Sequence, residues 1–330
     1  MFNNKIVLIT GGTGSFGKEF VKIILKKYKN IKKLIIFSRD ELKQFHMANM
    51  YPIKKYPSLR FFLGDIRDKE RLITACKNVD YIIHAAALKQ VPVAEYNPME
   101  FIKTNVYGAS NIIEAAIATK VKKVIALSTD KAAGPINLYG ATKLCSDKLF
   151  IAANNYAGNQ KQSFSIVRYG NVMNSRGSII PFFIEESKKG HIPITDVNMT
   201  RFNITLNECV KFVEFAFNLS KGGEIFVPKI PSFRIIDVAK AINNKAKLKI
   251  IGIRPGEKIH EEMITSADSL NTLELKNLFV ILPNQNKKLI NYYKNYHNAK
   301  LVPKEFSYNS FENKNYLNIK EIKQLINDNV

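Results

Sequence analysis

The sequence predicts a doubly wound α/β fold, in which helices cover both faces of a mainly parallel sheet. Apolar runs of five or six residues show no polar alternation, as expected for strands that are buried on both faces. Helix-like stretches separate these runs, and a glycine-rich turn joins the first run to the first helix. The 330 residues suffice for one large domain or for two.

Strands and helices alternate regularly through the first half of the chain. We expect strands at residues 5–10, 33–38, 60–65, 80–85, 123–128 and 164–168. We expect helices at residues 15–28, from Asp40 onward, and at 68–76, 98–118 and 139–156. Right-handed crossovers between parallel strands then place every carboxyl end at one edge of the sheet, where ligands bind.

The pattern loosens after Val172. Short strands at 224–227, 249–252 and 279–282 alternate with helical pieces and proline-containing loops, and one last helix is expected at 319–326 within a tail of loops. We therefore expect a smaller α/β lobe over the ligand edge of the sheet. Residues 1–174 should form the sheet domain, to which later segments can return, and residues 175–330 mainly a substrate-binding lobe.

Composition excludes several classes of protein. Apolar residues make up 46% and charged residues 24% of the chain, which is globular usage and not that of a disordered, collagen-like or coiled-coil protein. The formal net charge is +22, but only nine of the 50 basic residues are Arg and the lysines are scattered. A phosphate-reading surface would favour Arg. We therefore expect a generally basic surface and no nucleic-acid partner.

The chain shows no sign of export, membrane insertion or metal binding. It leads directly into an apolar strand without a signal peptide, and no apolar run approaches the roughly 18 residues that span a bilayer. Cys76, Cys145 and Cys209 are far apart and odd in number, so we interpret them as buried thiols in a reducing cytoplasm. No H-E-x-x-H occurs, because no second histidine follows the His260-Glu261-Glu262 run, and no metal site is expected.

The turn after the first strand predicts a dinucleotide site. It reads Thr10-Gly-Gly-Thr-Gly-Ser-Phe-Gly17. Glycines three apart allow a tight turn, close approach to a pyrophosphate and close helix–strand packing, while the helix N-terminus supplies free N–H groups. The expected contacts are Gly11, Thr13, Gly14, Ser15, Phe16 and Gly17.

The end of the second strand favours NADP over NAD. An NAD site usually carries an acid there to bind the ribose 2′-hydroxyl, whereas this chain has Ser38 and Arg39, followed by Asp40. A guanidinium can bind a 2′-phosphate through two hydrogen bonds. The alternative is a surface ion pair of Arg39 with Asp40 or Glu41. Residues 1–174 are thus expected to form an NADP-binding Rossmann domain.

Asp65 and Ile66 end the third strand. A carboxylate at this place can accept a hydrogen bond from the adenine amino group. The alternative role of Asp65 is that of a helix N-terminal cap.

A tyrosine and a lysine four residues apart predict oxidoreductase chemistry. Tyr139 and Lys143 lie on one face of the expected helix. A nearby ammonium should lower the pKa of the phenol, so that Tyr139 can exchange a proton with a carbinol, and Lys143 can hold the nicotinamide ribose. Just before this helix, Ser128-Thr-Asp-Lys131 ends the fifth strand at the ligand edge.

These motifs give the chain a recognisable resemblance. Residues 10–17 with Tyr139 and Lys143 resemble the extended short-chain dehydrogenase/reductase family. Residues 38–43, 85–89, 128–132, 168–172, 199–202 and 252–258 narrow the resemblance to the soluble, C5-inverting UDP-N-acetylglucosamine 4,6-dehydratases of pseudaminic acid synthesis. It covers nearly the whole chain. Membrane-anchored relatives carry an extra transmembrane half and often Met in place of Tyr139, and both departures favour the soluble branch.

The resemblance implies a reaction. Bound NADP oxidises the sugar at C4, water is eliminated across C5 and C6, and C6 is reduced. Asp130 would be the general acid and Lys131 the base, with Thr129 bonded to the 4-oxygen. Lys131 must then be neutral, which burial and nearby Lys143 or Lys89 would favour. Lys131 and Tyr139 are both candidates for reprotonating C5.

The resemblance also implies further site residues and an assembly. Cofactor contacts are expected from Ser38, Arg39, Asp40, Glu41, Leu42, Lys43, Asp65, Ile66, Ala85, Lys89, Asn105, Tyr139 and Lys143. Substrate contacts are expected from Lys89, Asn171, Thr195, Arg201, Arg254 and Glu257, with the loop 174–178 opening the second lobe. The alternatives are a surface position for Lys89 and structural salt bridges for Arg201 and Arg254. A homo-oligomer is expected, for which a hexamer is one form.

Two other functions remain open at this point. A nucleotide-sugar 4-epimerase would use Tyr139 and Lys143 but needs no Asp130–Lys131 pair. A regulatory protein could bind NADP without turnover, although the intact set of Thr129, Asp130, Lys131, Tyr139 and Lys143 argues against lost activity.

Overall fold

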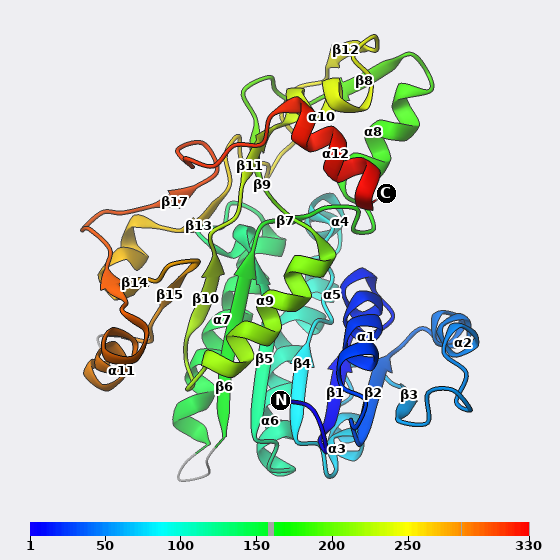
Figure 1. Cartoon of the computed structure of the whole chain (residues 1–330), viewed down its shortest axis with the longest axis vertical. Coiled ribbons are helices and arrows are strands. Elements are labelled where there is room, and N and C mark those ends of the chain that lie inside the picture. The colour runs from blue at the N-terminus through cyan, green and yellow to red at the C-terminus, as the bar shows by residue number, and fades with distance from the viewer. Residues whose placement is uncertain (158–161, 285, 330) are drawn as a thin grey trace.

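A computed structural model describes residues 1–157, 162–284 and 286–329. Residues 158–161, 285 and 330 lie outside it, the last two within the expected 175–330 lobe. Figure 1 shows one large central sheet with helices in front of it and behind it, and a smaller group of elements beyond one edge.

The central sheet confirms the doubly wound fold. Ten strands of the described residues form it, and seven of them are parallel in the order β3-β2-β1-β4-β5-β6-β10. These strands are β1 (Ile6–Thr10), β2 (Lys33–Ser38), β3 (Leu59–Leu63), β4 (Tyr81–His84), β5 (Lys123–Thr129), β6 (Ser163–Tyr169) and β10 (Ile225–Pro228). Every residue of β1 and β6 is buried, which explains their unbroken apolar runs. The strand order reverses between β1 and β4, so a crevice opens there at the carboxyl ends.

Helices cover both faces of the sheet. In Figure 1, α1 (Ser15–Lys27) and α9 (Leu206–Leu219) lie together in front, and α6 (Gly108–Ala118) and α7 (Leu138–Tyr156) lie behind. Two further helices of this half are α2 (Glu41–Met50), which packs on β3, and α3 (Lys69–Cys76), which packs on α6. The helices buried against the sheet leave its carboxyl edge open to ligands.

The long helix expected at 98–118 is interrupted. The chain forms α4 (Val91–Tyr96), which was not predicted, then α5 (Pro98–Phe101), a π-helical segment at Ile102–Tyr107, and only then α6. The wider turn carries Asn105, whose amide accepts from Leu88 N at 2.9 Å and donates to Leu88 O at 2.9 Å. Asn105 therefore fixes the loop after β4 to the helix behind it, and π-helical turns are frequent at functional sites.

Two strands expected in the lobe join the main sheet instead. β10 pairs parallel with β6, and β15 (Leu278–Ile281) pairs antiparallel with β10. All residues of both strands are buried, which is typical of inner strands of a large covered sheet. The antiparallel side ends with β14 (Thr272–Glu274) and β16 (Lys300–Leu301). The tail also contains an unpredicted helix, α11 (Lys287–His297).

The remaining elements form a lobe beyond the carboxyl ends of the strands (Figure 1). A second apolar cluster holds it together, including Phe183, Ile194, Phe233, Val238 and Ile322. Its elements are α8 (Ile179–Ser187), β8 (His191–Ile194), α10 (Ile235–Ile242), β12 (Lys247–Ile250) and α12 (Ile319–Asn329). Short strands link lobe and sheet: β7 (Asn171–Val172), β9 (Thr200–Ile204), β11 (Ser232–Arg234), β13 (Glu262–Ile264) and β17 (Tyr308–Asn309).

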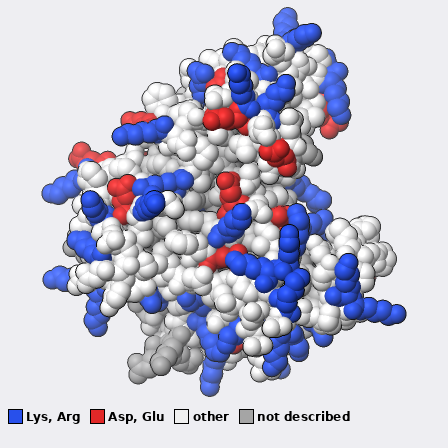
Figure 2. Space-filling view, in the orientation of Figure 1, with Lys and Arg blue, Asp and Glu red and all other residues white. Residues whose placement is uncertain are grey.

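Figure 2 shows Lys and Arg side chains scattered over the visible face, with acidic side chains among them. None of the helices in the described ranges is long and apolar enough to cross a membrane. Of the three thiols, Cys76 and Cys209 are buried, but Cys145 is exposed, contrary to expectation. Cys145 lies two residues after buried Lys143 on α7 and so points to the opposite side of the helix.

Candidate active site

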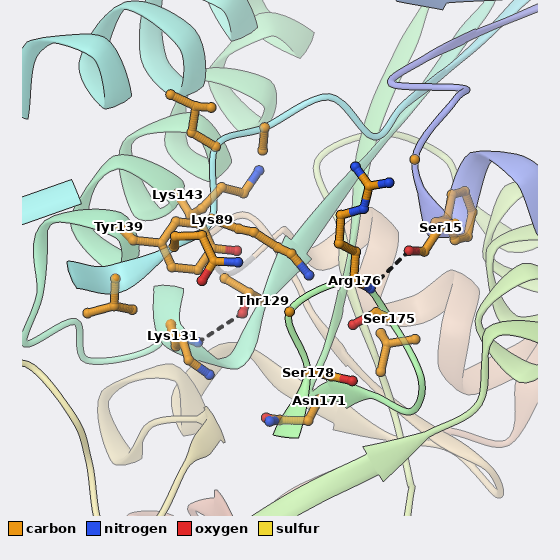
Figure 3. Close-up of a pocket in the computed structure, with 18 of the residues that line it drawn as sticks. Ser15, Lys89, Thr129, Lys131, Tyr139, Lys143, Asn171, Ser175, Arg176 and Ser178 are labelled. Atoms are coloured by element: carbon orange, nitrogen blue, oxygen red, sulfur yellow. Dashed lines mark hydrogen bonds between the residues drawn. The ribbon is translucent and has the colours of Figure 1, made fainter. Parts of the chain in front are cut away.

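A cavity of about 1010 Å³ lies where the crevice of the sheet meets the lobe. One wall comes from the carboxyl ends of β1, β2, β4 and β5, and the other from the lobe. In Figure 3, Lys89, Thr129, Lys131, Tyr139 and Lys143 gather on one side, while Ser15, Asn171 and residues of the loop 174–178 lie on the other.

The glycine turn fits a dinucleotide. Gly14 begins α1 without a side-chain cap, so first-turn N–H groups remain available to a phosphate. Gly11 adopts a φ of 66° beside the backbone of Ala86, and a Cβ at Gly17 would overlap with the backbone of Gly12. All six residues expected from this turn line the cavity: Gly11, Thr13, Gly14, Ser15, Phe16 and Gly17.

Arg39 lines the cavity at the end of β2 and keeps an exposed guanidinium. Its ion-pair partner is Asp65, at 3.8 Å, and not Asp40 or Glu41 as the alternative supposed. Asp40 instead caps α2, where its carboxylate accepts from Lys43 N at 2.9 Å. Loosely held Arg39 is therefore able to turn toward a phosphate.

Asp65 does not cap the next helix. That role belongs to Asp68, while Asp65 accepts from Arg67 N at 3.0 Å and from the Arg67 guanidinium at 2.8 Å. Partial burial disfavours the charge of Asp65, but the hydrogen bonds from Arg67 outweigh it and lower the pKa of this carboxyl. Asp65 thus stays a hydrogen-bond acceptor in the cavity lining, next to Ile66.

Helix α7 carries Tyr139 and Lys143 into the cavity wall. Its cap is Asn137, which accepts from Gly140 N at 2.8 Å, and Lys143 Nζ donates to Leu127 O at 2.9 Å. Gly140 lies directly against the turn after β5, where a Cβ would overlap with the backbone oxygen of Lys131. The helix that carries the Tyr–Lys pair therefore contacts the backbone of the Asp–Lys pair through Gly140.

Lys143 was expected to lower the pKa of the Tyr139 phenol. This prediction is wrong for the protein without bound ligands. Burial raises the pKa of Tyr139 to about 12, and the groups that oppose this rise are Lys131 and a hydrogen bond with Thr129. Burial lowers the pKa of Lys143 itself, against the pull of Asp147. Tyr139 is consequently a neutral phenol in this structure.

Asp130 has the environment of a general acid. It is 1% exposed, and its Oδ1 accepts from Thr129 Oγ1 at 2.7 Å and from Lys131 N at 2.9 Å. Burial raises the pKa of Asp130 in spite of the nearby Lys131 ammonium. A carboxyl that holds its proton more firmly can deliver it to a leaving hydroxyl.

Lys131 lies between two carboxylates. Its Nζ is 3.3 Å from Asp130 Oδ1 and 3.0 Å from Glu261 Oε1. Burial alone would lower the pKa of Lys131, but Asp130 and Glu261 outweigh it and raise the pKa. The expectation that burial with Lys143 or Lys89 holds Lys131 neutral is therefore wrong, since the second carboxylate was not foreseen.

The expected substrate residues meet at the lobe side of the cavity. Buried Arg201 donates to Thr200 O at 2.7 Å and Ile259 O at 2.9 Å, so part of its guanidinium is structural. Arg254 is exposed at the rim and pairs with Glu257. Asn171, Thr195, Arg201, Arg254 and Glu257 all line the cavity.

Lys89 and the loop 174–178 complete the wall. Lys89 lines the cavity with an exposed side chain, and partial desolvation together with the Lys131 ammonium lowers its pKa. Arg176 N of the loop donates to Ser15 Oγ at 3.1 Å, which ties the lobe to the glycine turn (Figure 3).

Three expected cofactor residues lie outside the cavity lining: Glu41, Leu42 and Asn105. Leu42 points outward from α2 with 63% exposure. Asn105 lies behind the wall, where it holds the loop that carries Leu88. Glu261 is the residue that the sequence analysis missed, because its only signal was an acidic pair after His260 that was considered for metal binding alone.

The sheet order, the glycine turn and the buried Tyr139–Lys143 pair define a Rossmann-type protein with the fold of the short-chain dehydrogenases/reductases. Residues 7–283 match the family described as Polysaccharide biosynthesis protein, and the chain belongs to that family.

Individual relatives sharpen the comparison and confirm the resemblance to inverting dehydratases. A protein of Campylobacter jejuni subsp. jejuni serotype O:2 named UDP-N-acetylglucosamine 4,6-dehydratase (inverting) is 54% identical, over 99% of this chain and 98% of its own. A Rickettsia bellii protein named UDP-glucose 4-epimerase is 43% identical, over 99% and 96%. The solved structure of Pen from Bacillus thuringiensis has a TM-score of 0.90 at 38% identity, covering 99% of this chain and 98% of that one.

Proposed function

We propose that the protein is a C5-inverting UDP-N-acetylglucosamine 4,6-dehydratase that retains NADP. The observation that carries this proposal is the pairing of buried Asp130 with half-buried Lys131, whose backbone oxygen contacts the Tyr139 helix. An acid and a base at that place suit an elimination that follows oxidation. The 54% identity to a protein of that name supports the substrate.

The first residue to act is Tyr139, which would take the proton of the C4 hydroxyl as a phenolate, a form that the positive charge of Lys131 and of bound NADP⁺ would favour over the neutral phenol of the protein alone. When bound, NADP⁺ supplies a hydride acceptor for C4, and the reduced form supplies the hydride for C6. The 4-ketone acidifies the C5 proton, which Lys131 removes as a free amine. Asp130 protonates the C6 oxygen, so that the C6–O bond breaks and water leaves.

Three groups of residues would hold the cofactor. The glycine turn would bind the pyrophosphate through the open N-terminus of α1. Lys143 would hold the nicotinamide ribose. Arg39 would bind the 2′-phosphate of NADP. Two observations support NADP over NAD: the strand-end position of Arg39 carries no carboxylate, and Arg39 pairs only loosely with Asp65.

Inversion requires C5 to be reprotonated from the opposite face of the ring. Lys131 and Tyr139 are the candidates for this step, and both line the cavity. The product would be UDP-2-acetamido-2,6-dideoxy-β-L-arabino-hex-4-ulose, formed in the first step of pseudaminic acid synthesis. A homo-oligomer is supported by apolar side chains exposed on α2, including Leu42 and Phe45, and size-exclusion chromatography with light scattering tests it.

A second candidate function is 4-epimerisation. It is favoured by the Rickettsia bellii relative, which is named an epimerase and matches over the full length. An epimerase oxidises and reduces C4 only, so it breaks neither the C5–H nor the C6–O bond.

Turnover in deuterium oxide separates the two functions. The purified protein is incubated with UDP-N-acetylglucosamine, and the product is examined by NMR and mass spectrometry. A dehydratase gives a 6-deoxy-4-keto sugar with deuterium at C5, and NMR couplings report the C5 configuration. A product that keeps its C6 hydroxyl and its C5 proton contradicts the proposal.

A further inference from the structure

Arg176, in the loop 174–178 of the lobe, lines the cavity with an exposed side chain. The chain has nine arginines, and all of them lie in the described ranges. The other eight have the guanidinium next to a carboxylate or a backbone oxygen: Arg39, Arg60, Arg67, Arg71, Arg168, Arg201, Arg234 and Arg254. The guanidinium of Arg176 has neither kind of partner among the described residues. It is therefore available to an anion that enters the cavity.

The backbone of the loop fixes Arg176 beside the glycine turn. Arg176 N donates to Ser15 Oγ at 3.1 Å, and Ser15 is the first residue of α1. On the other side of the loop, Gly177 lies so close to the side chain of Gln90, after β4, that a Cβ would overlap with it. The loop 174–178 thus spans the crevice between the carboxyl ends of β1 and β4. Its position is set by backbone contacts and leaves the guanidinium uncommitted.

The Arg176 side chain faces the cofactor half of the cavity. In Figure 3 it extends beside Ser15 and away from Ser178, which lies further toward the lobe. Its charge also acts on Asp40 at the start of α2. Hydrogen bonds from Lys43 lower the pKa of Asp40, and the charge of Arg176 acts in the same direction. Ser15 follows β1 and Asp40 follows β2, so the guanidinium is near the two strand ends where a dinucleotide would lie.

A pyrophosphate bound at the glycine turn needs more than backbone N–H groups. Both of its phosphates are negatively charged, and residues 10–17 contain no Lys or Arg. The open N-terminus of α1 supplies N–H donors and a partial positive charge only. Arg39 lies at the end of β2, where the 2′-phosphate is expected. Arg176 can supply a full charge and two parallel hydrogen bonds at the pyrophosphate.

We propose that Arg176 binds the pyrophosphate of the dinucleotide from the lobe side, opposite the glycine turn, an inference that rests on the proposed NADP-dependent function. The cofactor would then lie between the sheet and the loop 174–178, in contact with both halves of the molecule. The reaction gives this contact a role, because the hydride taken from C4 is returned to C6 and the cofactor must stay bound between the two steps. A cation on the lobe slows release of the cofactor and takes no part in bond breaking.

The test compares Arg176→Ala and Arg176→Lys with the wild type. Both variants keep the backbone N–H that contacts Ser15, and the side chain that they replace is exposed, so the free energy of unfolding should not change. Arg60→Ala is the matched control, because it removes the same charge near the amino end of β3, outside the cavity lining. Radiolabelled NADP⁺ or NAD⁺ is bound to the full chain, and its release into an excess of the unlabelled dinucleotide gives the dissociation rate.

Arg176→Ala should release both dinucleotides about 10- to 100-fold faster than the wild type, which is the usual contribution of hydrogen bonds to charged groups. The factor should be equal for NADP⁺ and NAD⁺, because both contain the pyrophosphate. Arg176→Lys should recover part of the loss, since an ammonium keeps the charge but not the paired hydrogen bonds. Arg60→Ala should release both dinucleotides at the wild-type rate.

Three results would overturn the proposal. Unchanged release from Arg176→Ala would mean that Arg176 does not contact the cofactor. Faster release of NADP⁺ alone would place Arg176 on the 2′-phosphate and not on the pyrophosphate. Unchanged release together with a weaker affinity for UDP, measured by calorimetry on the loaded protein, would place it on the nucleotide sugar.

The release measurement uses no sugar substrate, so it separates this proposal from the dehydratase function. If the wild type forms no 6-deoxy product while Arg176→Ala releases both dinucleotides faster, the dehydratase assignment fails and the contact of Arg176 stands. If the wild type forms that product and the release rates are equal, the contact fails and the dehydratase assignment stands.

Discussion

The cofactor wall of the cleft draws its residues from successive strand–turn–helix units, whereas the wall facing it is assembled from distant segments. Gly14, Arg39 and Asp65 each follow a strand of the parallel sheet directly. Arg201 comes from β9, Glu261 precedes β13, and Glu261 is held by Ser310, 49 residues further along the chain. Local sequence fixes the first wall, while the second exists only after the whole chain has folded.

The largest effect is expected from Lys131→Ala, because Lys131 follows β5 on the sheet side and contacts Glu261 of the facing wall. It should abolish dehydration, because no other side chain takes the place of the C5 base, while dinucleotide affinity stays near normal because the glycine turn and Arg39 are untouched. Product analysis and cofactor titration measure the two properties. Retained dehydration would disprove the mechanism, and a parallel loss of cofactor affinity would mean that the walls are not independent.

Asp130→Asn should slow cleavage of the C6–O bond by roughly 10²–10⁴, the usual contribution of a positioned general acid. The amide keeps the size of the carboxyl but cannot deliver a proton. Single-turnover experiments should show the 4-ketone and reduced nicotinamide accumulating before elimination. An unchanged elimination rate would assign the acid role to another group.

Arg39→Asp tests the cofactor wall alone. Losing the hydrogen bonds to a 2′-phosphate and adding repulsion should weaken NADP by about 2–4 kcal/mol, with a smaller effect on NAD. Dissociation constants for both cofactors, measured by calorimetry, check this. If the preference for NADP persists, Arg39 does not read the 2′-phosphate.

The smallest effect is expected from Ser310→Ala, which tests the long-range support of the other wall. It leaves Glu261 N without its buried acceptor, which should lower the free energy of unfolding by about 1–3 kcal/mol. C5 exchange should slow, and cofactor affinity should not change. Chemical denaturation, deuterium exchange at C5 and cofactor titration report these properties. If only cofactor binding were lost, Ser310 would support the cofactor wall and not the wall facing it.

The difference between the walls also explains what could be predicted from the sequence. Buried strands and the glycine turn are local patterns, so the six strands of the first half and the residues lining the phosphate site were found directly. The apolar runs of β10 and β15 predict strands, but they do not specify with which strands these two will pair, so their place in the main sheet could not be predicted. The π-helical turn at Asn105 is stabilised by the Leu88 loop and has no local signal.

The charge of Lys131 was mispredicted for the same reason. The residues near it in sequence provide Asp130, but the second carboxylate, Glu261, arrives from 130 positions further along the chain. Likewise, the pKa of Tyr139 is raised chiefly by burial, in a cluster with Ala94 and Phe101 from a segment about 40 residues earlier in the chain, and the lysine one helical turn away does not set it. The protonation states at this site therefore depend on the tertiary structure and cannot be predicted from neighbouring residues in the sequence.

The contact at Gly140 has a consequence for how oxidation and elimination are coupled. Because this residue has no side chain, the Tyr139 helix rests on the backbone oxygen of Lys131. A single methyl group there would force the helix and the turn apart, and a displacement of about 1 Å can cost a reaction 10²-fold. The short distance between Tyr139, which acts at C4, and the Asp130–Lys131 pair, which acts at C5 and C6, thus depends on the absence of a side chain at Gly140.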